Sequence, residues 1–580
     1  MVATYAAALA VLVASLAIGQ GALALCGLRG WSWLSSAVGL ALVCAICWGA
    51  ANLPGEGWTA AALVLALAVA SVLLLWRRRE ERGPVRAGLA VALPAAAFAS
   101  LPFLVEGHFG ILGTGFNPDM SQHLLATDRL AVGAGSQLEV QGYPLGPHAV
   151  VAALNDALGI GLAQAFNGLT MAVAILAPLA ALAAFRGQPL VRRSAVALLV
   201  GLPYLVASYY AQGSFKETMQ AFFLLAFVLS LREAAGNPQW RDMPLRFVPA
   251  ALIAVGSVYA YSFPGLLWLG GALVIWLLLE RRLALKPLLL GLAIFLIAVL
   301  PELGRMIDFQ RFETFDPSGP GLGNLFGQLS PFEALGIWPS GDFRVAPGDG
   351  AVPTVVYYLG AAFGSVLLLY GLAECWRRRE LTIVAGFAAA AGLYLAARAG
   401  GTPYTAAKAL EVGAPLVVLA ILLPITSVSW RAMRHMGAKV AIGAAYWVAA
   451  VGCSVLAFAN APVGPTDYSP ALTALRPLIS ADSALVLAPD RLLDEEQGER
   501  YLVWELRGGR VCVERESEAD AAPPPGVRFV LTTDSATQSP FPGFALRRRA
   551  APYLLWERAG AVRGQSPCPL IAVRQARQGP

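Results

Sequence analysis

Long apolar stretches separated by short polar connections dominate the chain from residue 3 to residue 460. We predict about fourteen such helices, most of them long enough to cross a hydrocarbon core of roughly 30 Å. Short pairs joined at Gly or Pro breaks are alternatively re-entrant segments. The pattern therefore predicts an α-helical polytopic membrane protein with about 12–14 transmembrane helices. The expected spans are 3–27, 32–53, 57–76, 87–105, 163–185, 194–211, 218–231, 247–262, 264–280, 284–301, 352–374, 381–398, 410–429 and 440–460.

The composition agrees with a membrane protein. Of the 580 residues, 57% are hydrophobic and 13% are charged, whereas about a quarter of the residues in a soluble domain carry a charge. A water-soluble protein is excluded, because so few polar residues could not cover the apolar surface. The net charge is +6. We interpret this excess as a topology signal and expect membrane lipid, and no nucleic acid, as a partner.

Arginine and lysine residues are distributed unevenly between the connections. When the stretches are threaded alternately through a bilayer, the short basic connections fall on one side, which we assign to the cytoplasm. The other side receives loops 106–162 and 302–351 and the tail. We therefore expect a multi-pass protein of the cytoplasmic membrane, with a membrane domain at 1–460 and an extracytoplasmic domain at 461–580. The cytoplasmic cations are Arg29, Arg77, Arg78, Arg79, Arg82, Arg86, Arg192, Arg193, Arg241, Arg281, Arg282, Arg377, Arg378, Arg379, Arg431 and Lys439.

The first residues resemble a secretory signal peptide only in part. Ala22-Leu23-Ala24 looks like a cleavage site, but no basic residues precede the apolar run. Cleavage would also reverse the alternation and place the cluster that begins at Arg77 outside. We therefore expect this segment to be retained as a membrane helix.

After residue 461 charged residues return, together with short runs rich in β-branched and aromatic residues. With a helical stretch near 470–478 and an amphipathic segment near 491–501, they predict a small α/β domain of about 110 residues. Cys512 and Cys568 lie in polar sequence, and on an oxidising exterior they form either a disulfide or two free thiols. The expected strands are 484–486, 501–506, 511–513, 528–532 and 552–556.

Loop 106–162 contains the densest group of ionisable residues. An Asn-Pro step favours a turn, so Asp119, which follows it, should lie at or just before a helix start. His123 then lies one turn later on the same face. A carboxylate at the boundary between apolar spans and the exterior suits a general base. An ordinary helix N-cap is the alternative for Asp119.

Three further residues of this loop are candidates. Glu106 and Asp128 are acids that would act beside Asp119, although Asp128 alternatively forms a surface pair with Arg129. His148 is a candidate for substrate binding, with a hydrogen-bonded structural role as the alternative. These acids and histidines match no established zinc spacing. We therefore predict no metal or other cofactor, with a divalent ion as the alternative.

Four cations on the outer side are candidates for binding an anionic group. A cation close to the membrane interface is costly, and a phosphate ligand would offset that cost. Snorkelling to lipid headgroups is one alternative. A second alternative is an ion pair with a nearby acid, which would be Glu217 for Lys216 and Glu411 for Lys408. The four cations are Lys216, Arg305, Arg344 and Lys408.

Loop 302–351 is rich in Gly and Pro, which predicts turns and a mobile lid. Within it, Trp338, Asp342 and Arg344 would hold a sugar by ring stacking and hydrogen bonds. A purely structural outer loop is the alternative.

This arrangement resembles the GT-C superfamily of integral-membrane glycosyltransferases, which use polyprenyl-phosphate-linked sugars on the outer face of the membrane. The likeness covers nearly the whole chain. It rests on many spans, a first outer loop with the acid of Asn-Pro-Asp-Met-Ser-Gln-His, the Tyr-Pro-Leu-Gly-Pro-His stretch after it, a later outer loop and an outward α/β domain. The resemblance implies a glycosyltransferase whose donor is a polyprenyl-phosphate sugar and whose acceptor is a glycan, lipid or protein.

The resemblance also implies roles for particular residues. In that superfamily an acid of the first outer loop deprotonates the acceptor hydroxyl, and Asp119 is the matching position. Basic residues near the membrane surface hold the lipid phosphate, a role that falls to the four outer cations. Many members have two adjacent acids, whereas Asp119 lies between Pro118 and Met120. Asp128 or Glu106 would then supply the second acid.

Other classes of protein share this membrane architecture. They are a lipid-linked glycan transporter or flippase, a glycan polymerase or ligase, and a non-enzymatic surface-assembly protein. A transporter predicts charges at mid-depth within the spans, whereas the outer acids of this chain gather in loops. A site that holds Asp119 together with two or more of the outer cations would favour the transferase.

Overall fold

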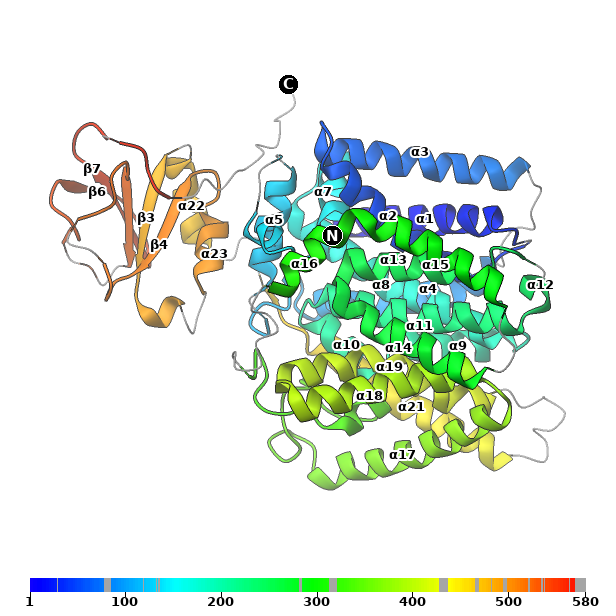
Figure 1. The fold of residues 1–580 in the computed structure, drawn as a ribbon. Helices are drawn as coiled ribbons and strands as arrows, with labels where there is room; N and C mark the ends of the chain where they lie inside the picture. The colour runs from blue at the N-terminus through cyan, green and yellow to red at the C-terminus, as the bar shows by residue number, and fades with distance from the viewer. Residues whose placement is uncertain are drawn as a thin grey trace.

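A bundle of long helices and a smaller domain built on a β-sheet make up the structure, which is a computed structural model (Figure 1). This architecture confirms the predicted helical membrane class with a small C-terminal α/β domain. The structure describes the chain except for residues 29, 78–84, 118, 132, 134–135, 242, 281–283, 312–320, 427–436, 465–468, 481, 494–497, 520–521, 534–535, 537, 563 and 569–580.

Every apolar stretch predicted from the sequence is a helix of the bundle. In the described part of the chain, ten helices are long and apolar enough to cross a membrane. The bent pair α9–α10, with 54° between its helices, and three shorter apolar helices account for the remaining predicted stretches. The helices are α1 (Val2–Leu25), α2 (Ser35–Ala51), α3 (Glu56–Arg77), α4 (Val85–Val105), α8 (Leu162–Ala181), α9 (Leu190–Gly201), α10 (Tyr204–Ala211), α11 (Phe215–Gly236), α13 (Val248–Tyr261), α14 (Phe263–Leu279), α15 (Leu285–Val299), α17 (Thr354–Arg377), α18 (Leu381–Gly400), α19 (Pro403–Thr426) and α21 (Gly437–Ala459).

Helices α8, α11 and α19 form the interior of the bundle, and nearly all of their side chains are buried. Helices α3 and α15 lie at its surface and expose leucines such as Leu65 and Leu292. A continuous apolar exterior of this kind is stable against lipid and unstable against water. The bundle is therefore a multi-pass membrane domain.

Helices α1 and α2 cross at two glycines. A Cβ on Gly19 would lie 1.9 Å from the carbonyl oxygen of Ser35, and one on Gly39 would lie 1.7 Å from that of Ser15. Both positions must therefore lack a side chain for the backbones to approach so closely, as at many helix contacts in membranes. This crossing ties α1 into the bundle.

The segments predicted to share the outer side meet at one end of the bundle. Figure 1 places α5 (Met120–Ala131), α7 (Gly146–Leu158) and α16 (Leu303–Arg311) at this end, beside the sheet domain, and α12 (Pro238–Arg241) at the other. Strand β1 (Ile111–Leu112) pairs with β2 (Val463–Gly464), which joins the first outer loop to the start of the tail. The shorter elements are α6 (Gln137–Val140), η1 (Leu182–Phe185), η2 (Leu300–Glu302) and η4 (Pro331–Leu335).

The C-terminal domain is a five-stranded mixed sheet of order β4-β3-β5-β7-β6. The central strand β3 is parallel to β4 and β5, and the hairpin β6–β7 adds antiparallel to β5. The predicted strand 501–506 is wrong, because residues 501–505 belong to a helix and residue 506 to the turn that follows it, and Leu502 and Leu506 are both buried. The elements are α22 (Pro470–Ile479), β3 (Ser483–Ala488), α23 (Gly498–Glu505), β4 (Arg510–Arg515), β5 (Phe529–Thr533), β6 (Phe544–Ala550) and β7 (Tyr553–Arg558).

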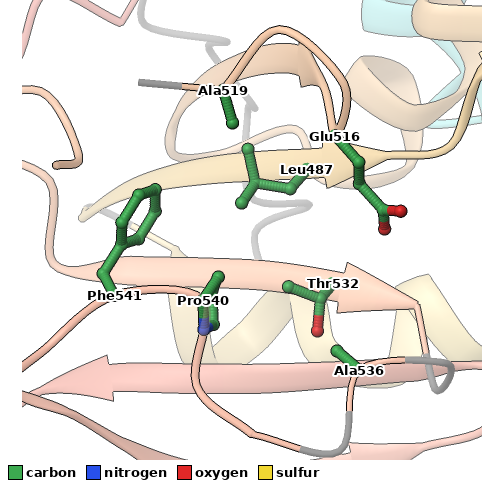
Figure 2. A pocket seen from close by; sticks show the side chains of 7 residues that line it. All are labelled: Leu487, Glu516, Ala519, Thr532, Ala536, Pro540 and Phe541. Carbon is green, nitrogen blue, oxygen red and sulfur yellow. The ribbon is translucent and has the colours of Figure 1, made fainter. Parts of the chain in front are cut away.

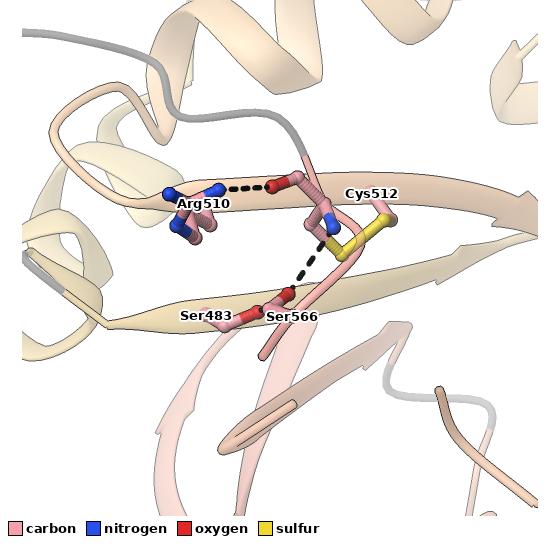
Figure 3. The surroundings of a disulfide bond; sticks show 5 residues. Ser483, Arg510, Cys512 and Ser566 are labelled. Atoms are coloured by element: carbon pink, nitrogen blue, oxygen red, sulfur yellow. Dashed lines mark hydrogen bonds between the residues drawn. A yellow bond between two sulfur atoms is a disulfide. The ribbon is translucent and has the colours of Figure 1, made fainter. Parts of the chain in front are cut away.

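Cys512 and Cys568 form a disulfide, which decides between the two alternatives left open by the sequence (Figure 3). Their Cα atoms are 4.9 Å apart. Arg510 donates to the carbonyl oxygen of Cys568 at 3.1 Å, and the backbone N–H of Cys568 donates to Ser566 Oγ at 3.2 Å. The bond therefore fastens the segment around Cys568 to strand β4.

Candidate active site

Asp119 lies immediately before α5, at the predicted helix start. Its carbonyl oxygen accepts from the backbone N–H groups of Gln122 at 3.0 Å and His123 at 3.3 Å. Its own N–H donates to Asn117 Oδ1 at 3.0 Å, and Gln122 Nε2 donates to its carboxylate at 3.3 Å. The side chain is half-buried. Asp119 therefore occupies a cap-like position and still presents a carboxylate at the outer end of the bundle.

Lys216 lies in the first turn of α11, with its ammonium against two tyrosine rings. Its Nζ stands 3.9 Å from the centre of the Tyr143 ring and 5.9 Å from that of Tyr261. Asp119 and Glu217 are both close enough to interact electrostatically with the ammonium. Among the described residues, no carboxylate lies within ion-pair distance of it. Aromatic faces thus stabilise a lysine whose charge is not taken up by a salt bridge.

Lys408 lies close by, in the second turn of α19, and has a different partner. Its Nζ is 3.0 Å from Glu217 Oε1 and 4.2 Å from the centre of the Tyr404 ring. The pairing crosses between helices, so both pairings considered from the sequence, Lys216 with Glu217 and Lys408 with Glu411, are wrong. A lysine that neutralises a buried carboxylate on a neighbouring helix has a structural role.

Two further polar side chains, Glu411 and Tyr209, are buried near these lysines. Glu411 is fully buried, and neither of its carboxylate oxygens has a hydrogen-bond partner among the described residues. The Tyr209 hydroxyl is buried without a partner in the same part of the structure. We call the whole group the outer cluster. Its half-buried rim consists of Asp119, Tyr143, Lys216, Tyr261, Tyr404 and Lys408, and its buried floor of Tyr209, Glu217 and Glu411.

His123 and His148 lie against this rim as a hydrogen-bonded pair. His123 Nδ1 is 3.1 Å from His148 Nε2. The ring of His123 packs on Tyr143 and Phe215, and the ring of His148 packs on Phe215 and Phe166. Burial lowers the pKa of His148 to about 3, so its imidazole is neutral at physiological pH. The structure thus brings together two histidines that the sequence offered as separate candidates.

The first outer loop reaches this position by close contact with the α10–α11 turn. Gly113 has φ +84°, and a Cβ there would lie 2.3 Å from the backbone of Gln212. Asn324, from loop 302–351, donates to the carbonyl oxygen of Phe116 at 2.9 Å and to Gln212 Oε1 at 2.5 Å. Residues of three separate segments therefore fix the backbone on both sides of the outer cluster.

Arg344 and Asp342 contribute to this scaffold, and their predicted role in binding a sugar stays a prediction. The guanidinium donates to both carboxylate oxygens of Asp342, at 2.9 and 2.8 Å. It also covers the rings of Phe116 and Phe326, with its Cζ 4.0 and 4.6 Å from their centres. Because its charge is neutralised and its faces are covered, Arg344 holds the two outer loops together.

Three other candidates are not members of the outer cluster. Arg305 forms an ion pair with Glu302 and donates to the backbone carbonyls of residues 142 and 258 at 2.9 and 3.2 Å, so it braces the chain next to Tyr143. Trp338 is 1% exposed and packs edge-on against a tyrosine ring, which leaves no face for a sugar. Glu106 is exposed at the end of α4.

Asp128 faces the C-terminal domain. It is buried on α5, and burial raises the pKa of its carboxyl to about 7 although Arg507 and Arg129 oppose the shift. Leu125, on the same helix, packs against the core of the C-terminal domain, and Trp504 packs into the core of the bundle. Helix α5 therefore carries Asp119 at its start and the domain contact along its length.

Two further observations bear on ligands. The described residues contain no group of three or more His, Cys, Asp or Glu side chains placed to hold a metal ion. A hollow of about 380 Å³ lies in the C-terminal domain at the carboxyl ends of β3, β4 and β5, with Glu516, Thr532 and Phe541 among its walls (Figure 2). It is separate from the outer cluster.

The sequence named Asp119, Lys216, Lys408 and the two histidines, but it gave no sign that they converge. It did not single out Tyr209, Tyr261 or Tyr404, because aromatic residues near span ends are common in any membrane protein. The sequence analysis considered Glu217 and Glu411 only as ion-pair partners of the two lysines. Their position inside apolar spans was the signal that could have assigned them to the site, since intramembrane acids are costly.

No family model and no curated protein matches the sequence. The arabinofuranosyltransferase AftD from Mycobacteria aligns with 81% of the chain at 15% identity and a TM-score of 0.50. The alignment covers 40% of AftD, so the chain spans less than half of that enzyme.

Two structures of archaeal proteins are also similar. The oligosaccharyltransferase of Archaeoglobus fulgidus in complex with Zn and sulfate aligns over 76% of this chain and 68% of its own, at 13% identity and a TM-score of 0.46. The oligosaccharyltransferase AglB of the same organism, in complex with an inhibitory peptide and a dolichol-phosphate, aligns over 77% and 69%, at 12% identity and a TM-score of 0.39. The chain shares its arrangement of helices with AftD, as the resemblance drawn from the sequence predicted.

Proposed function

We propose that the protein is a membrane glycosyltransferase that moves a sugar from a polyprenyl-phosphate donor to an acceptor on the outer face of the cytoplasmic membrane. The acceptor is a glycan, lipid or protein. Asp119 is the general base, and Lys216 binds the phosphate of the donor.

One observation carries the proposal. A half-buried carboxylate, Asp119, and a lysine without an ion pair among the described residues, Lys216, are close enough to interact electrostatically on the rim of the outer cluster, at the end of the bundle where both outer loops meet. The tyrosine rings hold the ammonium, which leaves it able to bind an anion.

The chemistry needs little more than these two groups. A sugar on a phosphate already has an activated leaving group, so the enzyme must position an acceptor hydroxyl, take its proton and stabilise the departing phosphate. Asp119 takes the proton as the hydroxyl oxygen attacks the anomeric carbon, and Lys216 stabilises the charge that develops on the phosphate oxygen. A single displacement of this kind inverts the anomeric configuration.

Transfer assays on the purified protein test the proposal. The protein is incubated with a panel of polyprenyl-phosphate sugars, and sugar release or transfer is measured. Asp119→Asn should lower the rate by roughly a hundredfold to ten-thousandfold, the usual contribution of a general base. Asp349→Asn, at an exposed acid of loop 302–351, is the matched control and should keep the wild-type rate.

A lipid-linked glycan flippase is the second candidate, and one observation favours it. Glu217, Lys408 and Glu411 are charged groups inside apolar spans, as transport pathways have. Glu217 lies in the first turn of α11, Lys408 in the second turn of α19 and Glu411 in its third turn. Reconstituted vesicles separate the two functions, because movement of a lipid-linked sugar across the bilayer without transfer would reject the transferase.

A further inference from the structure

His123 and His148, two of the four histidines in the sequence, lie in one aromatic enclosure behind Tyr143. They come from α5 and α7, and their facing nitrogens, Nδ1 of His123 and Nε2 of His148, are 3.1 Å apart. Only one of these two nitrogens carries the shared hydrogen. Which one carries it decides what each imidazole can do chemically.

The environment of His148 determines the position of its proton. The residue has no exposed surface, and its Nδ1 has no hydrogen-bond partner among the described residues. Phe166 and Phe215 pack on the ring and offer no acceptor. A buried N–H without an acceptor is rarer in proteins than a buried lone pair without a donor. The favoured form of His148 therefore has a bare Nδ1 and its proton on Nε2.

That form of His148 determines the form of His123. The Nε2–H of His148 donates to Nδ1 of His123, so a neutral His123 must carry its own proton on Nε2. The opposite arrangement, in which His123 donates from Nδ1, would push the proton of His148 onto Nδ1, where it meets no acceptor. A positively charged His123 would have the same consequence.

We propose that His148 is a positioning residue that holds His123 in the Nε2–H form, so that His123 is a hydrogen-bond donor at the outer cluster and not its base. In the proposed glycosyl transfer, on which this part of the inference rests, a nitrogen that already bears a proton cannot take one from the acceptor hydroxyl. The carboxylate of Asp119 is then the proton acceptor, although His123 follows it by one helical turn.

The ¹⁵N resonances of the histidines in the full-length protein test the inference without any assay of activity. A protonated ring nitrogen and a bare one differ widely in ¹⁵N chemical shift, and four histidines give a spectrum simple enough to assign with single variants. We expect both His123 and His148 to show a protonated Nε2 and a bare Nδ1. A protonated Nδ1 on either residue would overturn the inference, and it would leave the proposed glycosyl transfer unaffected.

Two variants of His148 add a functional test. His148→Gln keeps an N–H donor near the Nε2 position, so His123 should remain in its Nε2–H form and transfer should stay within about threefold of wild type. His148→Leu removes the donor, so the ¹⁵N spectrum of His123 should show a mixture of both forms, and transfer should fall roughly tenfold or more. If the leucine variant leaves the His123 spectrum unchanged, His148 does not position His123. If it fails to fold, the wild-type and glutamine spectra decide.

Discussion

Two lysines of the outer cluster have nearly the same surroundings and different partners. Lys216 and Lys408 each lie near the start of an apolar helix, and each Nζ stands about 4 Å from the centre of a tyrosine ring, at 3.9 and 4.2 Å. Lys408 also forms an ion pair with Glu217 at 3.0 Å, whereas Lys216 forms none with the described residues. Glu217, which follows Lys216 directly in sequence, therefore pairs with Lys408.

This difference indicates that one lysine stabilises the fold and the other is available to bind a ligand. Glu217 is 4% exposed, and a buried carboxylate needs a neutralising partner, which Lys408 supplies. Because that requirement is met by Lys408, the charge of Lys216 remains available for an anion that arrives from outside. We therefore interpret Lys408 as part of the fold and Lys216 as part of the site.

Removing Lys408 should have the largest effect on folding. Lys408→Met leaves Glu217 buried without its partner and should lower the free energy of unfolding by about 3–5 kcal/mol, measured by denaturation in detergent. The double variant Lys408→Met with Glu217→Gln removes both charges and should recover most of the loss. The matched variant Lys216→Met should change the stability by less than about 1 kcal/mol. Equal losses in the two lysine variants would show that the comparison is wrong.

Removing Lys216 should chiefly affect the donor. Lys216→Gln keeps a polar side chain but loses the charge, and a charge-assisted hydrogen bond contributes about 1.5–3 kcal/mol. We therefore expect roughly a tenfold to hundredfold weaker binding of a polyprenyl phosphate, measured by titration of the purified protein. Lys286→Gln, at the exposed start of α15, is the control and should bind as wild type. Unchanged binding by the Lys216 variant would reject its role.

The membrane architecture could be predicted from the sequence because each element depends on a local property. Apolar runs long enough to span a bilayer have few alternatives to the helix, since lipid satisfies no backbone hydrogen bonds. The tail was harder. Residues 501–506 are rich in aromatic and branched side chains, but residues 501–505 form the end of α23, because short apolar runs do not distinguish helix from strand. Strand β6, with three consecutive arginines from Arg547 to Arg549, was missed because edge strands tolerate such charge.

The candidate site could be predicted only residue by residue. Asp119 could be identified as a candidate because it follows an Asn-Pro turn. Lys216 could be identified because few cations lie on the predicted outer side. Their convergence depends on contacts between helices far apart in sequence, which no local pattern encodes. The crossed pair of Lys408 with Glu217 illustrates this, because sequence proximity favoured the two wrong pairings. The contacts of Arg344 with Phe116 and of Trp338 with Tyr357 were likewise not predictable, because those partners lie in other segments.

Asp128 extends the comparison to a buried acid outside the cluster. Unlike Glu217, it has a carboxylate oxygen without a hydrogen-bond partner among the described residues, and burial raises the pKa of its carboxyl to about 7. An unfolded aspartate has a pKa of about 3.9, so between these values the folded protein binds a proton that the unfolded chain has released. Stability should therefore fall as pH rises from about 4 towards 7.

This effect should be smaller than the loss on removing Lys408. With a folded pKa of about 7 we expect a loss of about 2–3 kcal/mol between pH 5 and pH 8, measured as the free energy of unfolding of the full-length protein. Asp128→Asn cannot ionise and should flatten this part of the profile, whereas Asp349→Asn should retain the wild-type slope. An unchanged slope in the Asp128 variant would mean that the carboxyl is already ionised at pH 5. Asp128 would then resemble Glu217, as an acid whose charge is neutralised by basic residues on another element.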